Sequence, residues 1–148
     1  MSEALPTDPG LRRVGLFWAC YQARDWAGAE ALLHPQASCR WRATRERFDG
    51  PAAIVHVNAV YPEGWSIHLL ELHRLAPQLV LSLVRVDHEG RSFWAHSHFR
   101  FEQEWIAQID EYWSDATEAP AWREGLAGRR LTPPDARPGL PLDPALWA

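Results

Sequence analysis

Residues 93–113 read FWAHSHFRFEQEWIAQIDEYW and contain two stretches of alternating character around a polar turn. Alternation with a period of two is typical of strands whose two faces differ. A three-residue loop at 103–105 places Phe99 opposite Ile109 and puts nearly all apolar residues on one side. A loop of even length would shift the partner by one residue and mix the two faces. The sequence therefore predicts a hairpin with one apolar and one polar face.

The predicted pairing assigns a distinct set of residues to each face of this hairpin. The first face is apolar apart from one serine and one glutamate, and its members are Phe93, Ala95, Ser97, Phe99, Ile109, Glu111 and Trp113. The second face is aromatic and basic, and its members include Trp94, His96, His98, Arg100 and Tyr112. We expect the functional pocket on the first face and the histidines on the second.

The composition bounds the class of protein. A chain of 148 residues is long enough for one domain with a proper core. The net charge of −4 argues against a nucleic-acid partner, because a phosphate-binding surface is basic. The two cysteines form no disulfide framework, and no run of 18 apolar residues could span a membrane. With no recognisable signal peptide, the expected location is the cytoplasm.

The order of patterns along the chain predicts an α+β architecture with three domain segments. Residues 1–10 form a polar lead, and residues 11–115 form one domain with three helices before a meander of strands. Residues 116–148 form a proline-rich C-terminal extension without periodicity. We expect truncation after about residue 126 to leave the fold intact, although Trp147 could dock elsewhere.

A metal site is one interpretation of the two histidines. The stretch from Gly90 to Glu102 fits the pattern G-x5-H-x-H-x3-E, the first half of the cupin motif. His96, His98 and Glu102 would then share a strand face and offer imidazole and carboxylate ligands. The pattern is incomplete, because Ile109 replaces its later glycine and no histidine follows His98. We therefore predict no metal and no cofactor, with the cupin-like site as a minor alternative.

Four short motifs occur in an order that resembles one superfamily. They are Asp25-Trp26, FDGPAAI at 48–54, FRFEQEWI at 99–106 and EYWSD at 111–115. Together they resemble the nuclear transport factor 2-like superfamily, in its SnoaL-like and ketosteroid isomerase-like branch. The resemblance implies a cone in which a curved, mostly antiparallel sheet wraps three N-terminal helices. It also implies a concave pocket for a small, largely apolar molecule, and a homodimer through the convex sheet face.

The resemblance does not carry over the catalytic residues of the ketosteroid isomerases. Those enzymes use a tyrosine on the first helix and one aspartate on each of two strands. The corresponding positions here are Phe17, Trp41 and Ser97, so none of the three groups is retained. The superfamily includes isomerases, cyclases, hydrolases and dehydratases, and the fold alone does not select among them.

Glu111 is the remaining candidate for acid–base catalysis. Burial on an apolar strand face raises the pKa of a carboxyl group, as a general acid or base requires. The expected ligand pocket comprises Phe17, Tyr21, Trp41, Asn58, Ser97, Phe99, Ile109 and Trp113. Glu111 could instead have a structural role, accepting from an indole N–H or pairing with an arginine. Two functions stay open: a pocket protein for a small apolar or aromatic molecule, with or without catalysis, and a non-catalytic dimeric binding or assembly module.

Overall fold

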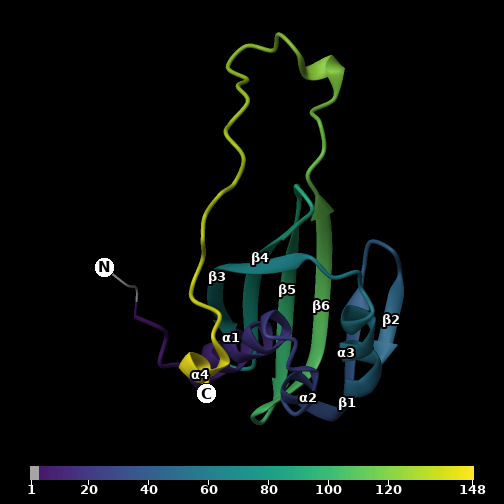
Figure 1. Cartoon of the computed structure of the whole chain (residues 1–148), viewed down its shortest axis with the longest axis vertical. Coiled ribbons are helices and arrows are strands. Elements are labelled where there is room, and N and C mark those ends of the chain that lie inside the picture. Colours follow the sequence, from purple (N-terminus) through teal and green to yellow (C-terminus); the bar gives the residue numbers. More distant parts are fainter. Residues whose placement is uncertain (1–3) are drawn as a thin grey trace.

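The computed structural model describes residues 4–148 and contains one mixed sheet with helices on one side (Figure 1). The helices are α1 (Pro9–Gln22), α2 (Trp26–Glu30), α3 (Pro51–Ala59) and α4 (Pro144–Trp147), with a 3₁₀ turn η1 at Ala121–Arg123. The strands are β1 (Leu33–Trp41), β2 (Glu46–Asp49), β3 (Trp65–Ala76), β4 (Leu79–His88), β5 (Arg91–Glu102) and β6 (Trp105–Asp115).

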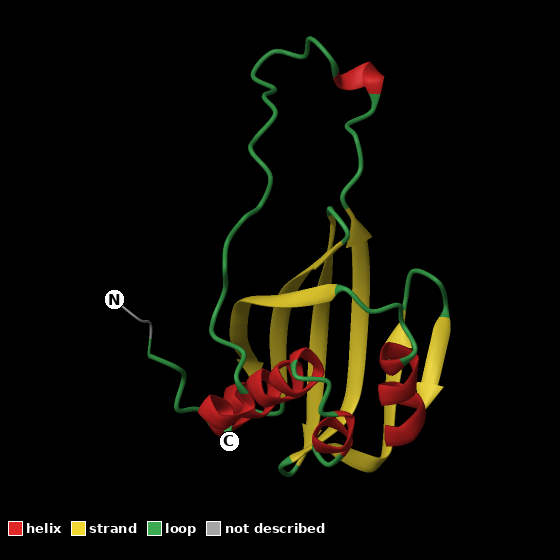
Figure 2. Cartoon of the chain, viewed as in Figure 1, coloured by secondary structure: helices red, strands yellow, loops and turns green. Residues whose placement is uncertain are grey.

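The six strands lie in the order β2-β1-β6-β5-β4-β3. Only the β1–β6 pair is parallel, so the sheet is mostly antiparallel, as the sequence predicts. The sheet curves around α1, α2 and α3, which gives the expected α+β cone (Figure 2). The short strand β2 was not predicted. It extends the sheet beyond β1 and adds a wall beside the concave face.

The register of the β5–β6 hairpin is the predicted one, but the turn differs. Phe99 pairs with Ile109, and Ser97 pairs with Glu111. The strands continue to Glu102 and Trp105, so the turn has two residues rather than three, and a bulge after Arg100 restores the odd offset. A bulge adds one residue to one strand and so keeps the apolar face continuous.

Helix α1 forms because its start is capped and one of its sides is apolar. The Asp8 carboxylate accepts from the backbone N–H groups of Gly10 and Leu11, at 2.8 and 3.1 Å. Such capping satisfies donors that a helix N-terminus leaves free. Pro9 occupies the first turn, so the helix begins two residues before the predicted start at residue 11. Its buried side packs into the concave face of the sheet.

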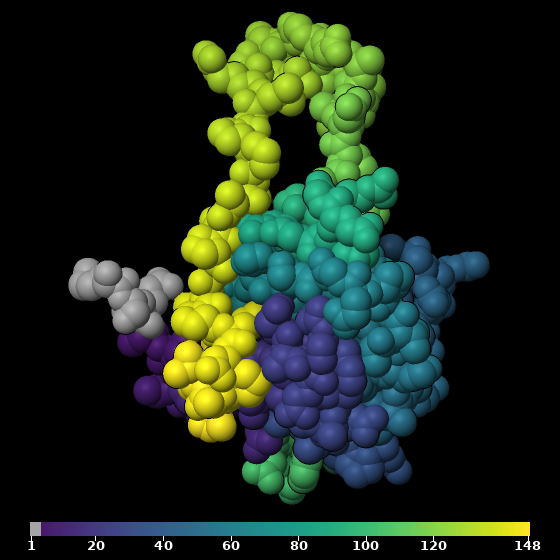
Figure 3. All heavy atoms as spheres, in the orientation of Figure 1, coloured from purple at the N-terminus to yellow at the C-terminus, as the bar shows by residue number. Residues whose placement is uncertain are grey.

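The end of the proline-rich extension is not free, which corrects the expectation of a dispensable tail. We call residues 135–148 the strap, and Figure 3 shows its yellow end packed beside the purple atoms of α1. Trp147 is 1% exposed and belongs to the core, and its indole N–H donates to the Pro141 carbonyl at 2.7 Å. Sequence periodicity missed this contact because a single aromatic side chain provides the burial.

The strap crosses the edge strand β3 before it reaches α1. The backbone N–H of Leu140 donates to the Leu69 carbonyl at 2.8 Å, forming an isolated bridge on the exposed sheet edge. Gly139 lies directly on the Leu69 backbone, where a Cβ atom would overlap main-chain atoms. The strap therefore covers part of an edge that would otherwise offer unpaired backbone groups.

The start of the strap is fixed by a buried arginine on the convex face of the sheet, the face turned away from the helices. The Arg85 side chain is 3% exposed and contacts the Asp135 carboxylate at 3.4 Å. It also donates to the Arg137 carbonyl at 2.8 Å and pairs with Asp87 at 2.9 Å. A buried guanidinium needs such partners, since an unpaired buried charge is costly.

Residues 116–134 form an extended loop that we call the arm. The arm leaves the end of β6 and stands away from the body, as Figure 3 shows. Its apolar residues Trp122, Leu126 and Leu131 are exposed. The arm thus connects the sheet to the strap and packs little of its own surface.

Replacing Gly15 with alanine is expected to destabilise the fold by about 1–3 kcal/mol, because a Cβ atom there would overlap the Trp147 ring. Urea denaturation measures the change. In a Trp147→Ala background the sign should reverse, since alanine favours a helix over glycine by about 0.5–1 kcal/mol. An equal effect in both backgrounds would contradict the packing of Trp147 on α1.

Candidate functional site

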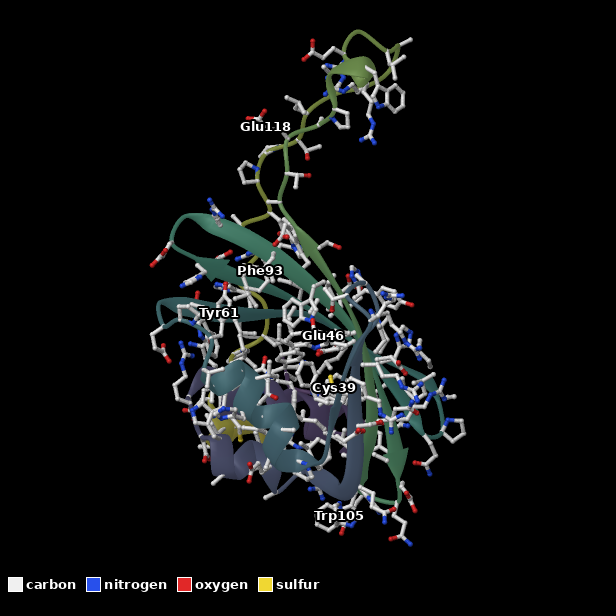
Figure 4. All side chains as sticks on the ribbon, turned by 90° about the vertical axis from the view of Figure 1, so that its right-hand side faces the viewer. Cys39, Glu46, Tyr61, Phe93, Trp105 and Glu118 are labelled. Atoms are coloured by element: carbon white, nitrogen blue, oxygen red, sulfur yellow. The ribbon has the colours of Figure 1, made fainter. Side chains whose placement is uncertain are left out.

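A cavity of about 520 Å³ lies between the concave face of the sheet and helices α1 and α3. Five of the predicted site residues line it: Tyr21, Trp41, Asn58, Glu111 and Trp113. In Figure 4, Glu46 and Phe93 lie nearer than Cys39 to the arm, which Glu118 marks. The cavity therefore has a buried end near Cys39 and a rim on the side of the arm.

Glu111 lies at the buried end of the cavity and accepts three hydrogen bonds. The Ser97 hydroxyl donates to Oε2 at 2.6 Å, while the Trp41 indole N–H donates to Oε1 at 3.0 Å. The Cys39 thiol contacts Oε1 at 3.4 Å. Burial raises the pKa of Glu111, and these three hydrogen bonds partly oppose the rise. The carboxyl group is therefore held in a fixed position and has a raised pKa.

Two of these donors are the residues that the sequence resemblance aligns with the aspartates of the ketosteroid isomerases. Trp41 pairs with Glu111 across the parallel β1–β6 register, and Ser97 pairs with it across β5–β6. The three side chains therefore meet on adjacent strands. The carboxyl group of Glu111 on β6 therefore lies between two neutral donors, one on each neighbouring strand.

The second polar pair of the cavity comes from two helices. The Asn58 amide donates to the Tyr21 hydroxyl oxygen at 3.2 Å and to the Ile54 carbonyl at 2.9 Å. Burial, followed by the charge of Glu111, raises the pKa of Tyr21 well above its ordinary value. Tyr21 therefore keeps its proton. Its oxygen accepts from Asn58, which leaves the phenolic O–H available as a donor.

Four residues predicted to line the pocket belong to the core instead. Phe17, Ser97, Phe99 and Ile109 are at most 2% exposed and do not line the cavity. Phe17 packs edge-to-face on Phe99, with ring centroids 5.5 Å apart. The strand pattern predicts which side of the sheet is concave. How closely helix α1 packs against that side then decides which residues of the face reach the open cavity.

Sequence reasoning missed several residues of the cavity wall, including Trp18, Glu46, Tyr61, Trp65 and Asp115. Asp115 could have been found, because it continues the period-two face that holds Trp113. Phe93 was predicted on this face but was not named as a pocket residue, and it lines the cavity. Glu46 had no such signal, whereas Tyr61 shares a helical spacing with Val57 and Asn58. Glu46 and Tyr61 come from the unpredicted strand β2 and from the residues after α3.

Two indole nitrogens of the wall have no hydrogen-bond partner in the described part of the chain. They are Nε1 of Trp65 and Nε1 of Trp113, both buried. Unsatisfied buried donors are rare in folded proteins, and such donors usually pair with an ordered water, an ion or a ligand. By contrast, the Trp18 N–H donates to the Ser82 hydroxyl at 3.0 Å.

The histidines of β5 do not assemble a metal site in the described residues. His96 and His98 lie on the convex face of the sheet, the side away from Glu111, as predicted. Glu102, the third expected ligand, contacts His34 at 3.6 Å. No group of three histidine, cysteine, aspartate or glutamate residues within 4–148 has a geometry that could hold a metal ion.

The convex face is partly covered by the strap. The Trp94 indole N–H donates to Asp135 at 3.2 Å, so this residue is less available to a partner than expected. The pKa of Asp135 is held well below its usual range, mainly by Arg137. His96, Arg100 and Tyr112 remain exposed.

Comparisons with solved structures identify the fold. A candidate ketosteroid isomerase from Kribbella flavida is 21% identical with a TM-score of 0.71, covering 82% of this chain and 91% of that chain. A nuclear transport factor 2-like protein of unknown function from Burkholderia xenovorans is 18% identical with a TM-score of 0.67, covering 80% and 92%. This chain has the nuclear transport factor 2-like fold. No protein-family model and no curated protein matches the sequence.

A third neighbour with the nuclear transport factor 2-like fold holds a small molecule. It is a hypothetical protein from Catenulispora acidiphila with a ketosteroid isomerase-like fold, in complex with trimethylamine. It is 15% identical with a TM-score of 0.57, covering 68% of this chain and 83% of that chain. At these identities the likeness establishes the fold alone. Within residues 4–148, no helix has the length and apolarity needed to cross a membrane.

Proposed function

We propose that this protein binds a small, largely apolar molecule in the concave pocket and that Glu111 acts on it as an acid–base residue. The supporting observation is a buried carboxyl group at the end of an open, aromatic-walled cavity of about 520 Å³. An apolar pocket with a few convergent polar groups and a shifted pKa is the usual form of an active site.

The roles of the polar groups follow from their protonation. Glu111, whose pKa is raised, exchanges a proton with the ligand at neutral pH more readily than an ordinary carboxylate. Tyr21 stays protonated and donates a hydrogen bond to a ligand oxygen, while Asn58 fixes its position. This pair and Glu111 suit the reactions that move a proton next to a carbonyl or hydroxyl group.

The alternative function is a non-catalytic dimeric binding or assembly module whose pocket is filled by its own side chains. The open cavity favours the first function over this alternative, since a filled cone would leave no space beside Glu111. Chemistry at Glu111 and pairing of subunits are compatible, because they use opposite faces of the sheet.

Native mass spectrometry of the purified protein tests the pocket directly. We expect a co-purifying small molecule that is released on denaturation. Carboxyl titration by NMR should then give Glu111 a pKa above the ordinary value of about 4.3. An ordinary pKa together with an empty pocket at all purification stages would reject the proposed function.

We expect a homodimer through the part of the convex face that the strap leaves open. That surface carries His96, Arg100 and the half-exposed Tyr112, and aromatic and arginine side chains are enriched at interfaces. Sedimentation velocity at micromolar concentration should give twice the mass of one chain. Tyr112→Asp should yield a folded monomer, whereas a wild-type monomer would contradict the prediction.

A further inference from the structure

We propose that the ligand of this pocket is a small organic cation, an ammonium group that carries apolar substituents. The inference rests on the proposed function, since it specifies the chemistry of the molecule that reaches Glu111. It is drawn from three properties of the cavity wall: its aromatic rings, its carboxyl groups and its lack of basic side chains.

Aromatic rings make up seven of the 16 residues that line the cavity. Four of them follow one another along the wall: Trp41, Trp113, Phe93 and Tyr61. Successive centroids are 6.1, 5.5 and 6.3 Å apart, and successive planes are inclined by 75°, 52° and 70°. Because neighbouring rings meet at steep angles, they form an angled wall, which we call the box, instead of a flat stack.

Ring faces of such a wall that are turned toward the cavity would attract a cation. The face of each aromatic ring carries partial negative charge, and cages of several rings are the typical sites for alkylated ammonium groups. A neutral apolar ligand needs no such arrangement, because aliphatic side chains would exclude water equally well. The rings are supplied by β1, β5, β6 and the segment after α3, so the box is a property of the assembled fold.

The charged groups of the wall all have the same sign. Glu111 lies at the buried end, and Glu46 and Asp115 line the rim. Neither rim carboxylate forms a salt bridge with another residue in the described part of the chain, so both are available to a cation. Trp41 lies between Glu46 and Glu111 in the strand register, which aligns carboxyl groups and rings in one row.

No lysine, arginine or histidine lines the cavity. Two basic groups contact aromatic residues of the wall from outside the cavity: Arg24 lies over the Trp65 ring at 3.3 Å, and His88 contacts the Tyr61 hydroxyl at 3.3 Å. Arg24 also pairs with Glu63 at 2.9 Å, and His88 contacts the Glu63 carbonyl at 3.1 Å. The wall therefore offers nothing that would neutralise an anion. The free indole N–H groups of Trp65 and Trp113 suit an oxygen atom elsewhere on the same ligand.

Two probes of nearly identical shape separate charge from size. Acetylcholine carries a trimethylammonium group and an ester oxygen, and 3,3-dimethylbutyl acetate replaces the cation with a neutral tert-butyl group. Calorimetric titration of the full chain is expected to show about tenfold or greater preference for acetylcholine, equivalent to about 1.4 kcal/mol. Here acetylcholine serves only as a probe of the chemical class.

Two variants test the source of that preference. Trp113→Leu removes one side of the box, and Glu46→Gln removes a rim charge without changing its size. Both should reduce the ratio of the two affinities toward one, while Trp122→Leu on the exposed arm should leave it unchanged. Circular dichroism checks that each variant is folded.

Binding of the neutral probe as tightly as the cation would overturn the inference and leave the proposed function standing. Failure of both probes at millimolar concentration would also overturn it. The proposed function is judged separately, by the co-purifying molecule and by the pKa of Glu111, so the two failures are distinguishable.

Discussion

Replacing Trp147 with alanine is expected to lower the free energy of unfolding by about 3–5 kcal/mol. The indole is 1% exposed and packs on Gly15 of α1, so truncation leaves a large cavity at the helix surface. It also leaves the Pro141 carbonyl without its donor. The change is a large fraction of the 5–15 kcal/mol that stabilises most domains.

Chemical denaturation followed by tryptophan fluorescence and circular dichroism measures this loss. Trp122→Ala is the matched control, because this residue is exposed on the arm and its loss should change stability by about 0.5 kcal/mol or less. Deleting residues 127–148 should destabilise at least as much as Trp147→Ala. A truncated protein that melts like the full chain would show that the strap contributes nothing to the core.

Replacing Glu111 with glutamine is expected to lower turnover of the natural ligand by about 10²–10⁴-fold while the fold is kept. The amide oxygen can still accept from the Trp41 N–H, and the amide nitrogen can donate to the Ser97 hydroxyl. The hydrogen bonds of the site therefore survive, whereas proton exchange does not. Stability at neutral pH should stay equal or rise, because a desolvated charge is removed.

The pH dependence of stability provides a second measurement for this variant. Burial raises the pKa of Glu111, so the folded state binds its proton up to a higher pH than the unfolded state does. The stability of the native protein should therefore fall as pH rises from the ordinary glutamate value through the raised one. Glu111→Gln should lack this fall, and Glu118→Gln on the arm should retain it.

Marked destabilisation of Glu111→Gln, by about 1–3 kcal/mol, would identify Glu111 as a structural acceptor for Trp41 and Ser97. Unchanged turnover in a stable variant would also reject the acid–base role. Thermal melts and mass spectrometry of the bound molecule distinguish these outcomes with one purified variant.

The fold was largely predictable because its decisive signals are local. Alternation in residues 93–113 sets the register, and Asp25 and Pro51 mark the starts of α2 and α3. The bulge in the β5–β6 hairpin was not predictable, since an odd loop and an even turn with a bulge give the same pairing. Strand β2 was missed because its four residues are mostly charged and carry little pattern.

The site was predictable in part, on helices as well as strands, since Tyr21 and Asn58 line the cavity as expected. Glu111 and Trp113 follow from the hairpin register, and both line the cavity. Phe17 shows the limit of the same reasoning, because a helix position gives the direction of a side chain but not the depth of the packed layer around it. The rim depends on Glu46 and Tyr61, whose segments become neighbours only when the sheet has formed.

Because of the arm and the strap, the chain can be cut into two pieces, a body and a C-terminal peptide. Apart from the covalent link through the arm, the strap is held to the body by non-covalent contacts of Arg85 and Leu69 and by the docked Trp147. The arm, which lies between β6 and the strap in the sequence, packs against little of the body. Protease cleavage within the arm should therefore yield two fragments that stay associated. The same division offers a split reporter, in which a peptide spanning residues 135–148 rebinds a truncated body and restores its stability.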